Sequence, residues 1–278
     1  MTKIAIISDV HGNLEALQTV LKDIENRGIE KIYCLGDTIA KGTHQQECID
    51  IVRKKCEVII RGNVDRFFSN ELDLSIATED DIKRYNWIKN KINEETKDFL
   101  RNLPFSYEFY LSGRLVRLVH AHPERDNKFI GNVDSISNLY SLVLPSENTI
   151  SNNKADVLIY GHIHMPFMQK MYNRYILNTG SVGDALDVIR NEEKDADVSF
   201  TSVVNYLILS GELDSKVKTD DISFEFISLS YDIGKELSSN SDNAELDEYV
   251  AELKTGLYRD MSKVYKTFED RGIDKNEI

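Results

Sequence analysis

The first 62 residues alternate short apolar runs with longer amphipathic segments, and this alternation restricts the fold more than any other feature of the chain. The runs KIAIIS, KIYCLG and EVIIRG have the length and the isoleucine-rich composition of buried strands. Between them, NLEALQTVLKDIENRG and QQECIDIVRKKC place apolar residues at helical spacing. The order strand, helix, strand, helix, strand predicts parallel strands joined by right-handed crossovers.

The second half of the chain is dominated by strand-like runs. A polar segment at residues 78–102 is expected to be helical and to end before Pro104. FSYEFYL and RLVRLVH then predict a hairpin around Ser112 and Gly113, and further strand-like runs follow before residue 231. An α/β fold with two sheets packed face to face and helices outside them accommodates both halves of the chain.

The chain is expected to comprise one domain, residues 1–230, and a C-terminal helical extension, residues 231–278. The charged run at 187–200 interrupts the strand pattern and is interpreted as a surface loop. From Tyr231 onward the sequence is acidic and amphipathic, which favours helices packed on the domain over a separate unit. The same helices offer a surface through which a homo-oligomer could form.

Composition narrows the classes of function. The formal net charge of −13 argues against a broad nucleic-acid surface, but not against a small phosphate substrate, because bound cations can reverse the local field. The apolar runs fall short of the roughly 20 residues that a membrane span needs, and the N-terminus lacks a secretory signal pattern. Three irregularly spaced cysteines do not make a disulfide framework, so a cytoplasmic protein without a membrane partner is predicted.

Polar side chains gather where the predicted strands end. Histidines stand in SDVHGN, LVHAHP and YGHIHM, and other polar candidates follow strands in LGDTIAKG and RGNVD. Alternate residues of a strand share a face, and ligands bind at the carboxyl ends of strands in open α/β sheets. The positions supply carboxylate, amide and imidazole groups from Asp9, His11, Asp37, Asn63, His120, His162 and His164.

This combination of residue types is typical of a metal centre. Taken singly, each motif has a simpler explanation, such as a turn or helix cap for Asp9 and a turn for Asn63. Their joint appearance favours metal binding, and imidazole with carboxylate suits Mn, Fe, Ni or Zn ions. The set exceeds what one tetrahedral ion takes, and it suits two divalent ions that share a bridging carboxylate.

These motifs, in this order, resemble those of the calcineurin-like metallophosphoesterases. The family pattern of Asp-x-His, Gly-Asp, Gly-Asn-His-Asp/Glu, a lone His and Gly-His-x-His is matched by DVH, GDTIAKG, GNVD, VHAHP and GHIH. The resemblance covers residues 1–230 and implies a four-layer αββα sandwich with a two-metal site at one edge. The loop LNTGSVG is similar to one in the small bacterial phosphodiesterase branch, whose members are linked to dinucleoside polyphosphate or phosphodiester hydrolysis.

The resemblance also implies roles for the ligands. The first metal would be held by Asp9, His11 and His164, the second by Asn63, His120 and His162, and both by a bridging Asp37. Two such ions lower the pKa of a bridging water, and the resulting hydroxide attacks phosphorus in line with the leaving group. The implied reaction is phosphoester hydrolysis by a phosphodiesterase or a nucleotide pyrophosphohydrolase.

One position departs from the family pattern. Val64 stands where many members carry a histidine that is interpreted as the proton donor to the leaving oxygen, while Asn63 and Asp65 are kept. Valine cannot transfer a proton, and general acid catalysis is typically worth about 10²- to 10⁴-fold. Leaving groups that need no proton, such as nucleotide phosphates and aryl oxides, are therefore expected to react best.

Five further residues are candidates around this centre. His122 is the first candidate for a replacement proton donor, with a supporting hydrogen bond near the ligands as its alternative role. Asp65 is the second, although it could instead cap the following turn or pair with Arg66. Arg61, Arg66 and His44 are candidate substrate contacts, and each could equally be an ordinary surface residue.

Two other functions are compatible with the same fold. Protein serine/threonine phosphatases resemble this family too, but the motif they share includes the histidine that Val64 replaces. A binding scaffold, such as the retromer subunit of the family, needs no metal ligands, whereas this chain keeps every expected ligand position. A metallophosphoesterase that acts on a small phosphate ester or nucleotide is therefore the favoured function.

Overall fold

Strand β1 (Thr2–Ile7) lies at the centre of the first sheet, and its side chains alternate between two layers of the core. Ile4 and Ile6 pack against the second sheet, whereas Ala5 and Ile7 pack against helices on the outer face. Burial on both faces explains why this strand is an uninterrupted apolar run. The computed structural model describes residues 1–70, 79–186, 203–239 and 246–256, so the loop predicted at 187–200 lies outside the described residues.

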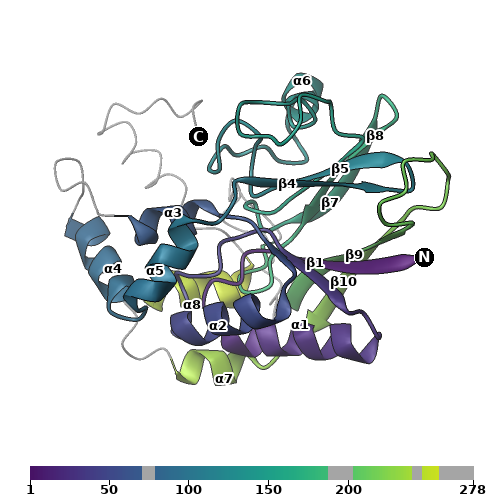
Figure 1. The fold of residues 1–278 in the computed structure, drawn as a ribbon. Coiled ribbons are helices and arrows are strands. Elements are labelled where there is room, and N and C mark those ends of the chain that lie inside the picture. The colour runs from purple at the N-terminus through teal and green to yellow at the C-terminus, as the bar shows by residue number, and fades with distance from the viewer. Residues whose placement is uncertain (71–78, 187–202, 240–245, 257–278) are drawn as a thin grey trace.

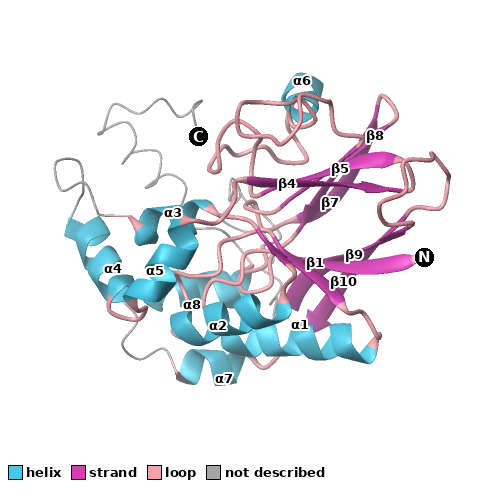
Figure 2. Ribbon diagram, viewed as in Figure 1, coloured by secondary structure: helices cyan, strands magenta, loops and turns pink. Residues whose placement is uncertain are grey.

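The first sheet is mixed, with the strand order β10-β9-β1-β2-β3 (Figure 1). Besides β1 it comprises β2 (Lys31–Cys34), β3 (Val58–Ile59), β9 (Val203–Gly211) and β10 (Ser223–Ser230). Strands β1 to β3 are parallel, as the N-terminal alternation predicts, and β9 and β10 add antiparallel pairs. The crossover helices α1 (Leu14–Asn26) and α2 (Gln45–Lys55) cover the outer face of this sheet (Figure 2).

The second sheet is also mixed, with the strand order β4-β5-β6-β8-β7. Its strands are β4 (Ser106–Leu111), β5 (Arg114–Val119), β6 (Val157–Tyr160), β7 (Pro166–Met171) and β8 (Arg174–Thr179). The predicted hairpin β4–β5 turns at Ser112 and Gly113, whose φ angles of 48° and 73° are those of a tight left-handed turn. Helix α6 (Ile136–Ser141), which no sequence pattern predicted, packs through Leu139 on the outer face of this sheet.

The two sheets meet face to face in one apolar layer. Ile6 and Leu207 of the first sheet share this layer with Leu118, Ile159 and Leu177 of the second. Helices lie on the outer face of each sheet, so the four-layer αββα arrangement expected from the sequence is confirmed (Figure 2).

A block of helices extends the molecule beside strand β3. It consists of α3 (Asn63–Ser69), α4 (Glu79–Lys89) and α5 (Glu94–Arg101), which share an apolar cluster with α2 (Figure 1). The helical segment predicted at 78–102 is therefore two helices. Asn93 begins the second of them by accepting a hydrogen bond from the backbone N–H of Thr96 at 2.8 Å.

The C-terminal segment packs on the first sheet's helical layer as far as it is described. Helix α7 (Ile233–Ser238) lies against α1, where Lys235 forms a 2.6 Å ion pair with Glu15. Helix α8 (Leu246–Thr255) buries Tyr249 and Leu253. The rest of the predicted extension, residues 240–245 and 257–278, lies outside the described residues.

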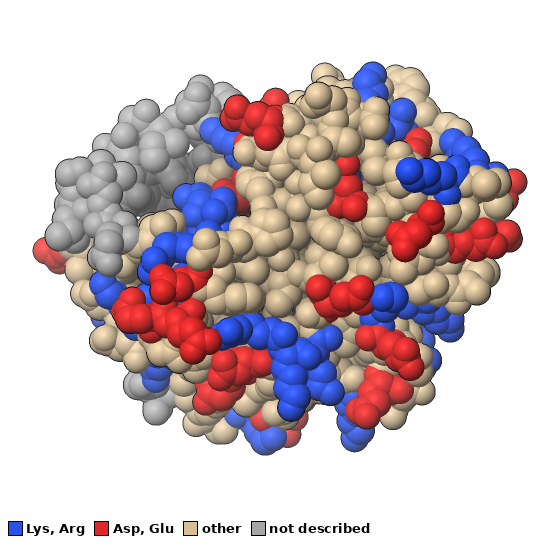
Figure 3. Space-filling view, viewed as in Figure 1, with Lys and Arg blue, Asp and Glu red and all other residues tan. Residues whose placement is uncertain are grey.

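Two surface properties bear on partners. Among the helices described, none combines the length and apolar character that crossing a membrane requires. Figure 3 shows acidic and basic side chains interspersed over the described residues of one face, rather than a continuous basic surface.

Candidate metal centre

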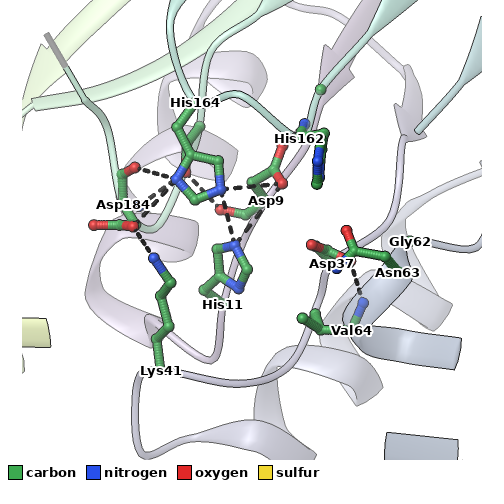
Figure 4. Close-up of polar contacts among 12 residues, drawn as sticks. Asp9, His11, Asp37, Lys41, Gly62, Asn63, Val64, His162, His164 and Asp184 are labelled. Carbon is green, nitrogen blue, oxygen red and sulfur yellow. Dashed lines mark hydrogen bonds and ion pairs between the residues drawn. The ribbon is translucent and has the colours of Figure 1, made fainter. Parts of the chain in front are cut away.

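The seven predicted ligands lie in the segments that follow five strands, and the structure brings them together. Segments after β1, β2, β3, β5 and β6 carry, in this order, Asp9 with His11, Asp37, Asn63, His120, and His162 with His164. Asn63 is the first residue of α3, and the other six lie in loops. Two clusters of potential ligand atoms result, one of Asp9, His11 and His164 and one of Asp37, His120 and His162. Figure 4 labels the first cluster together with Asp37 and His162 of the second. Ligand atoms within each cluster all lie within 4.8 Å of one another.

The backbone of these loops is strained at the candidate ligands themselves. Left-handed φ angles of 51° to 67° occur at Asp9, His11, Asp37, His162 and His164. Such angles are uncommon outside glycine, and they persist only where the surrounding structure holds them. Close packing of the loops supplies that constraint, because a Cβ atom on Gly161 would lie 2.5 Å from Oδ2 of Asp9 and one on Gly62 would lie 2.0 Å from Oδ1 of Asp37.

In the first cluster, two imidazole nitrogens meet beside a buried carboxylate. Nε2 of His11 lies 3.0 Å from Nε2 of His164, and Oδ1 of Asp9 lies 3.8 Å and 3.3 Å from these two nitrogens. Within the described part of the chain, that oxygen makes no well-oriented hydrogen bond. The remaining ring nitrogens donate to backbone carbonyls, since Nδ1 of His11 contacts Ile39 at 3.0 Å and Nδ1 of His164 contacts Asp184 at 2.7 Å.

In the second cluster, Nε2 of His120 lies among oxygen atoms. It is 3.2 Å from Oδ2 of Asp37 and 3.0 Å from Oδ1 of Asn63, while Nδ1 of the same ring donates to the carbonyl of Leu35 at 2.8 Å. The side-chain oxygen of Asn63 faces hydrogen-bond acceptors rather than donors. If the amide were turned, its nitrogen would donate to Nδ1 of His162 at 3.0 Å.

These geometries fit bound cations. When Nδ1 of a histidine donates to a carbonyl, the neutral ring presents a lone pair at Nε2, which is how metal-binding histidines are commonly oriented. Lone pairs of His11 and His164 therefore point at each other beside a carboxylate oxygen, an arrangement that either a shared proton or a cation must stabilise. The donor set of nitrogen and oxygen atoms suits divalent transition-metal ions.

The pKa values show that protons fill this role when no metal is bound. Burial disfavours the imidazolium form, but Asp9 and the hydrogen bond to Asp184 overcome it and raise the pKa of His164 to about 9. In the second cluster, burial is likewise overcome by Asp37, which raises the pKa of His120 to about 10. Burial and the neighbouring imidazolium lower the pKa of His11 and of His162 to about 4.

Both candidate proton donors are engaged in other contacts. Nδ1 of His122 accepts from the backbone N–H of Glu124 at 3.1 Å, so its Nε2 carries the proton and donates to Oγ of Ser141 at 2.9 Å. Burial lowers the pKa of His122 to about 4, which keeps this ring neutral. These contacts argue against His122 as the proton donor, and they join it to Ser141 and Glu124 rather than to a candidate ligand.

Asp65 holds the loop of the second cluster together. It accepts hydrogen bonds from the backbone N–H groups of Asp37 at 2.7 Å, Thr38 at 3.0 Å and Gly62 at 3.0 Å. Burial and the nearby Asp37 carboxylate raise the pKa of Asp65 to about 6. Its geometry is that of a cap for α3, the alternative that the sequence left open.

The three candidate substrate contacts differ in their surroundings. Arg66 is fixed by a bidentate pair with Asp126, at 2.7 Å and 3.0 Å. Arg61 and His44 are partly buried, and Nε of Arg61 and Nδ1 of His44 have no hydrogen-bond partner among the residues that the structure describes. Val64 is half-buried at the second cluster, where its backbone N–H donates to Oδ1 of Asp37 at 3.0 Å (Figure 4).

Sequence reasoning missed three charged residues beside the first cluster. Asp184, in the loop after β8, contacts His164, and Lys41 contacts both Asp184 and Glu252 of α8. The position of Asp184 directly after the LNTGSVG motif is the only sequence signal that could have pointed to it. Lys41 stands within the GDTIAKG motif, but that motif points to Asp37 rather than to Lys41, and nothing marks Glu252, which resembles a surface charge in the sequence.

Comparison with known proteins identifies the family. The model of the calcineurin-like phosphoesterase superfamily domain matches residues 2–195. The chain is 31% identical over 221 residues to an uncharacterized protein of Methanocaldococcus jannaschii, an alignment that covers 72% of this chain and 86% of the relative.

Two solved structures share the fold. A metallophosphoesterase from Sphaerobacter thermophilus matches with a TM-score of 0.66 and 22% identity, over 92% of this chain and 99% of the other. A hypothetical protein from Pyrococcus horikoshii matches with a TM-score of 0.73 and 17% identity, over 93% of this chain and 100% of the other. The family model covers well over half of the chain, and the chain belongs to the calcineurin-like phosphoesterase superfamily.

Proposed function

We propose that the protein is a metal-dependent phosphodiesterase or nucleotide pyrophosphohydrolase with two divalent ions, of Mn, Fe, Ni or Zn, at this centre. One observation supports the metal requirement above all others. Nε2 atoms of His11 and His164 lie 3.0 Å apart beside the buried carboxylate of Asp9, on backbone held at left-handed φ. Membership of a phosphoesterase superfamily supports the class of reaction.

Each candidate ligand then has a role. In this assignment Asp9, His11 and His164 would hold the first ion, Asn63, His120 and His162 the second, and Asp37 would contact both. Two ions bound there would supply an activated water near neutral pH and gather charge from the phosphoryl oxygens. Carbonyl groups of Ile39, Leu35 and Asp184 hold three of the rings in the orientation that presents Nε2.

The leaving group is where this chain's own residues limit the reaction. Val64 has no proton to give, the proton of His122 is donated to Ser141, and Asp65 accepts three backbone hydrogen bonds. A leaving oxygen that departs without a proton is therefore the best substrate for this site. Nucleotide phosphates and aryl oxides have such oxygens, whereas simple alkoxides and the serine or threonine side chains of a phosphoprotein do not.

A series of phosphodiesters with graded leaving groups tests this proposal. After reconstitution with Mn²⁺, kcat/KM should fall steeply as the pKa of the leaving alcohol rises, with at least about 10²-fold separating nitrophenol from an alkyl alcohol beyond their uncatalysed difference. Dinucleoside polyphosphates, cyclic nucleotides and phosphopeptides belong in the same screen. A flat dependence would contradict the missing donor, and two bound ions without turnover of any ester would favour a scaffold.

A further inference from the structure

Three buried charged residues connect the C-terminal helix α8 to the first ligand cluster. We propose that Asp184, Lys41 and Glu252, here named the charge strap, are positioning residues through which α8 fixes the His164 ring for its metal ion. This inference rests on the metal centre proposed above, and it goes further by making the C-terminal helix part of that centre.

The strap is continuous from the helix to the histidine. Nζ of Lys41 donates to Oε2 of Glu252 at 2.8 Å and to Oδ2 of Asp184 (Figure 4 shows the latter contact). Nδ1 of His164 in turn donates to the backbone carbonyl of Asp184 at 2.7 Å and lies 3.1 Å from its Oδ2. A rigid displacement of Glu252 therefore reaches the ring through three successive contacts, by way of Lys41 and Asp184.

Burial makes these contacts consequential. Lys41 is 5% exposed, Asp184 0% and Glu252 1%, so the strap places two negative charges and one positive charge in the interior. Buried charges are expensive to desolvate, and breaking a buried pair by removing one partner typically costs about 3–5 kcal/mol. Apolar residues of similar size often attach a helix equally well. Attachment of α8 alone therefore does not explain why three charged residues are buried here.

The strap is anchored in the loops that carry the ligands. Lys41 has a φ of 66° and follows Ala40, whose backbone N–H donates to Oε1 of Gln45 at 2.7 Å. At the other end, the backbone N–H of Asp184 donates to Oγ of Ser181 at 2.8 Å. That same hydroxyl donates to the backbone carbonyl of Asp9 at 2.8 Å. The Asp184 end is thus tied to the segment that presents Asp9, and the Lys41 end to that of His11, whose backbone carbonyl accepts from the backbone N–H of Gly42 at 2.8 Å.

A carboxylate on the far nitrogen of a metal-binding histidine has a known physical effect. It fixes the ring orientation and raises the basicity of the ligand, and removing such a partner typically weakens metal binding by about 10- to 100-fold. Asp184 has this position relative to His164, and Lys41 restricts the Asp184 carboxylate to the rotamer that reaches the ring. Because coupling between two sites is reciprocal, a bound ion must then stabilise α8 in return.

Hydrogen exchange of the full-length protein, with and without Mn²⁺, tests this reciprocity. In the wild type, Mn²⁺ should slow amide exchange of residues 246–255. In Lys41→Met and in the milder Glu252→Gln variant, that slowing should be lost. The Mn²⁺ ion of the first cluster, measured by calorimetric titration, should bind about 10- to 100-fold more weakly than in the wild type. Glu30→Gln removes the same charge from an exposed position between α1 and β2 and should behave as the wild type.

The outcomes separate two failures. If the wild type binds two ions but α8 exchange does not respond, or if Glu252→Gln keeps both the response and the affinity, the strap is only a structural attachment and the inference is overturned. If the wild type binds no divalent ion at all, the proposed metal centre fails first and the strap fails with it. Lys41→Met can unfold, because it leaves two buried carboxylates, whereas Glu252→Gln keeps the size of the side chain and removes only the charge that pairs with Lys41.

Discussion

The two ligand clusters are supported by different kinds of structure. Behind the first cluster lie charged side chains, with Asp184 on His164 and Lys41 joining it to α8. Behind the second lies a single buried carboxylate, Asp65, which accepts from three backbone N–H groups and contacts no basic side chain among the described hydrogen bonds and ion pairs. Side chains of the first cluster are buried, whereas His162 and Asn63 of the second are only half-buried.

In the proposed function, this difference gives the two metal ions separate roles. A deeply buried cluster braced on its far side suits an ion that stays bound. A partly open cluster beside Val64 and the helical block suits the ion that a substrate approaches. Asp37 interacts with both clusters. Its carboxylate lies beside Nε2 of His120 in the second cluster, and its charge interacts electrostatically with His11 of the first.

The largest effect is expected from Asp37→Asn. If Asp37 bridges the ions, this variant weakens both clusters, and because paired ions supply several kcal/mol of transition-state stabilisation, kcat should fall by about 10³-fold or more. Metal analysis of the purified variant should show fewer than two ions per chain. His11→Ala is the matched variant of one cluster only and should keep the second ion. Loss of a single ion in Asp37→Asn, with kcat little changed, would contradict a bridge.

A smaller effect, with the opposite sign, is expected from Val64→His. The backbone N–H that Val64 donates to Asp37 remains after substitution, so the ion-binding loop is undisturbed. An imidazole at this position should speed release of alkyl alcohols by about 10²-fold and leave nitrophenol esters unchanged. Val64→Leu, which adds bulk without a proton, is the control. No gain for alkyl esters would mean that the second cluster lacks more than a proton donor.

The ligand positions could be predicted from the sequence because strands impose simple rules. Parallel pairing collects strand ends at one edge of a sheet, and a strand end is marked by neighbouring residues, which a single sequence displays. Strand alternation does not hold at Asp9 and His11, because both lie beyond the end of β1 at left-handed φ angles of 55° and 51°. The αββα layers follow for the same reason, since apolar runs in β1 and β6 require cover on two faces.

The strap could not be predicted, because its members are distant in sequence and ordinary in type. Lys41 and Glu252 are separated by 211 positions, and each resembles a solvated charge. His122 illustrates a related limit. Its spacing from His120 predicts a shared face, but its Nε2 bonds to Ser141 of α6, a six-residue helix with no sequence pattern of its own. Contacts that depend on tertiary packing leave no periodic signal.

The smallest predicted effect concerns the proton that one histidine of each metal-free cluster carries. With pKa values of about 9 and 10, His164 and His120 are protonated at pH 7 in the metal-free protein. A metal ion needs the neutral ring, so each cluster should release about one proton on binding, and the affinity for each ion should rise about tenfold per pH unit below these values. Calorimetric titration with Mn²⁺ in two buffers of different ionisation enthalpy measures the release.

The same protons fix the sign of the pH dependence of stability. Raised histidine pKa values stabilise the metal-free fold fully below the ordinary value of 6.5, and this stabilisation is lost as pH rises towards 9 and 10. The Tm of the metal-free protein should therefore fall over this range, while that of the metal-loaded protein should not.

Asp184→Asn distinguishes the clusters, because it removes a cause of the raised pKa of His164 and should reduce proton release in the first cluster alone. Binding without any proton release would show that both rings are already neutral, and that the two carboxylates do not hold imidazolium partners.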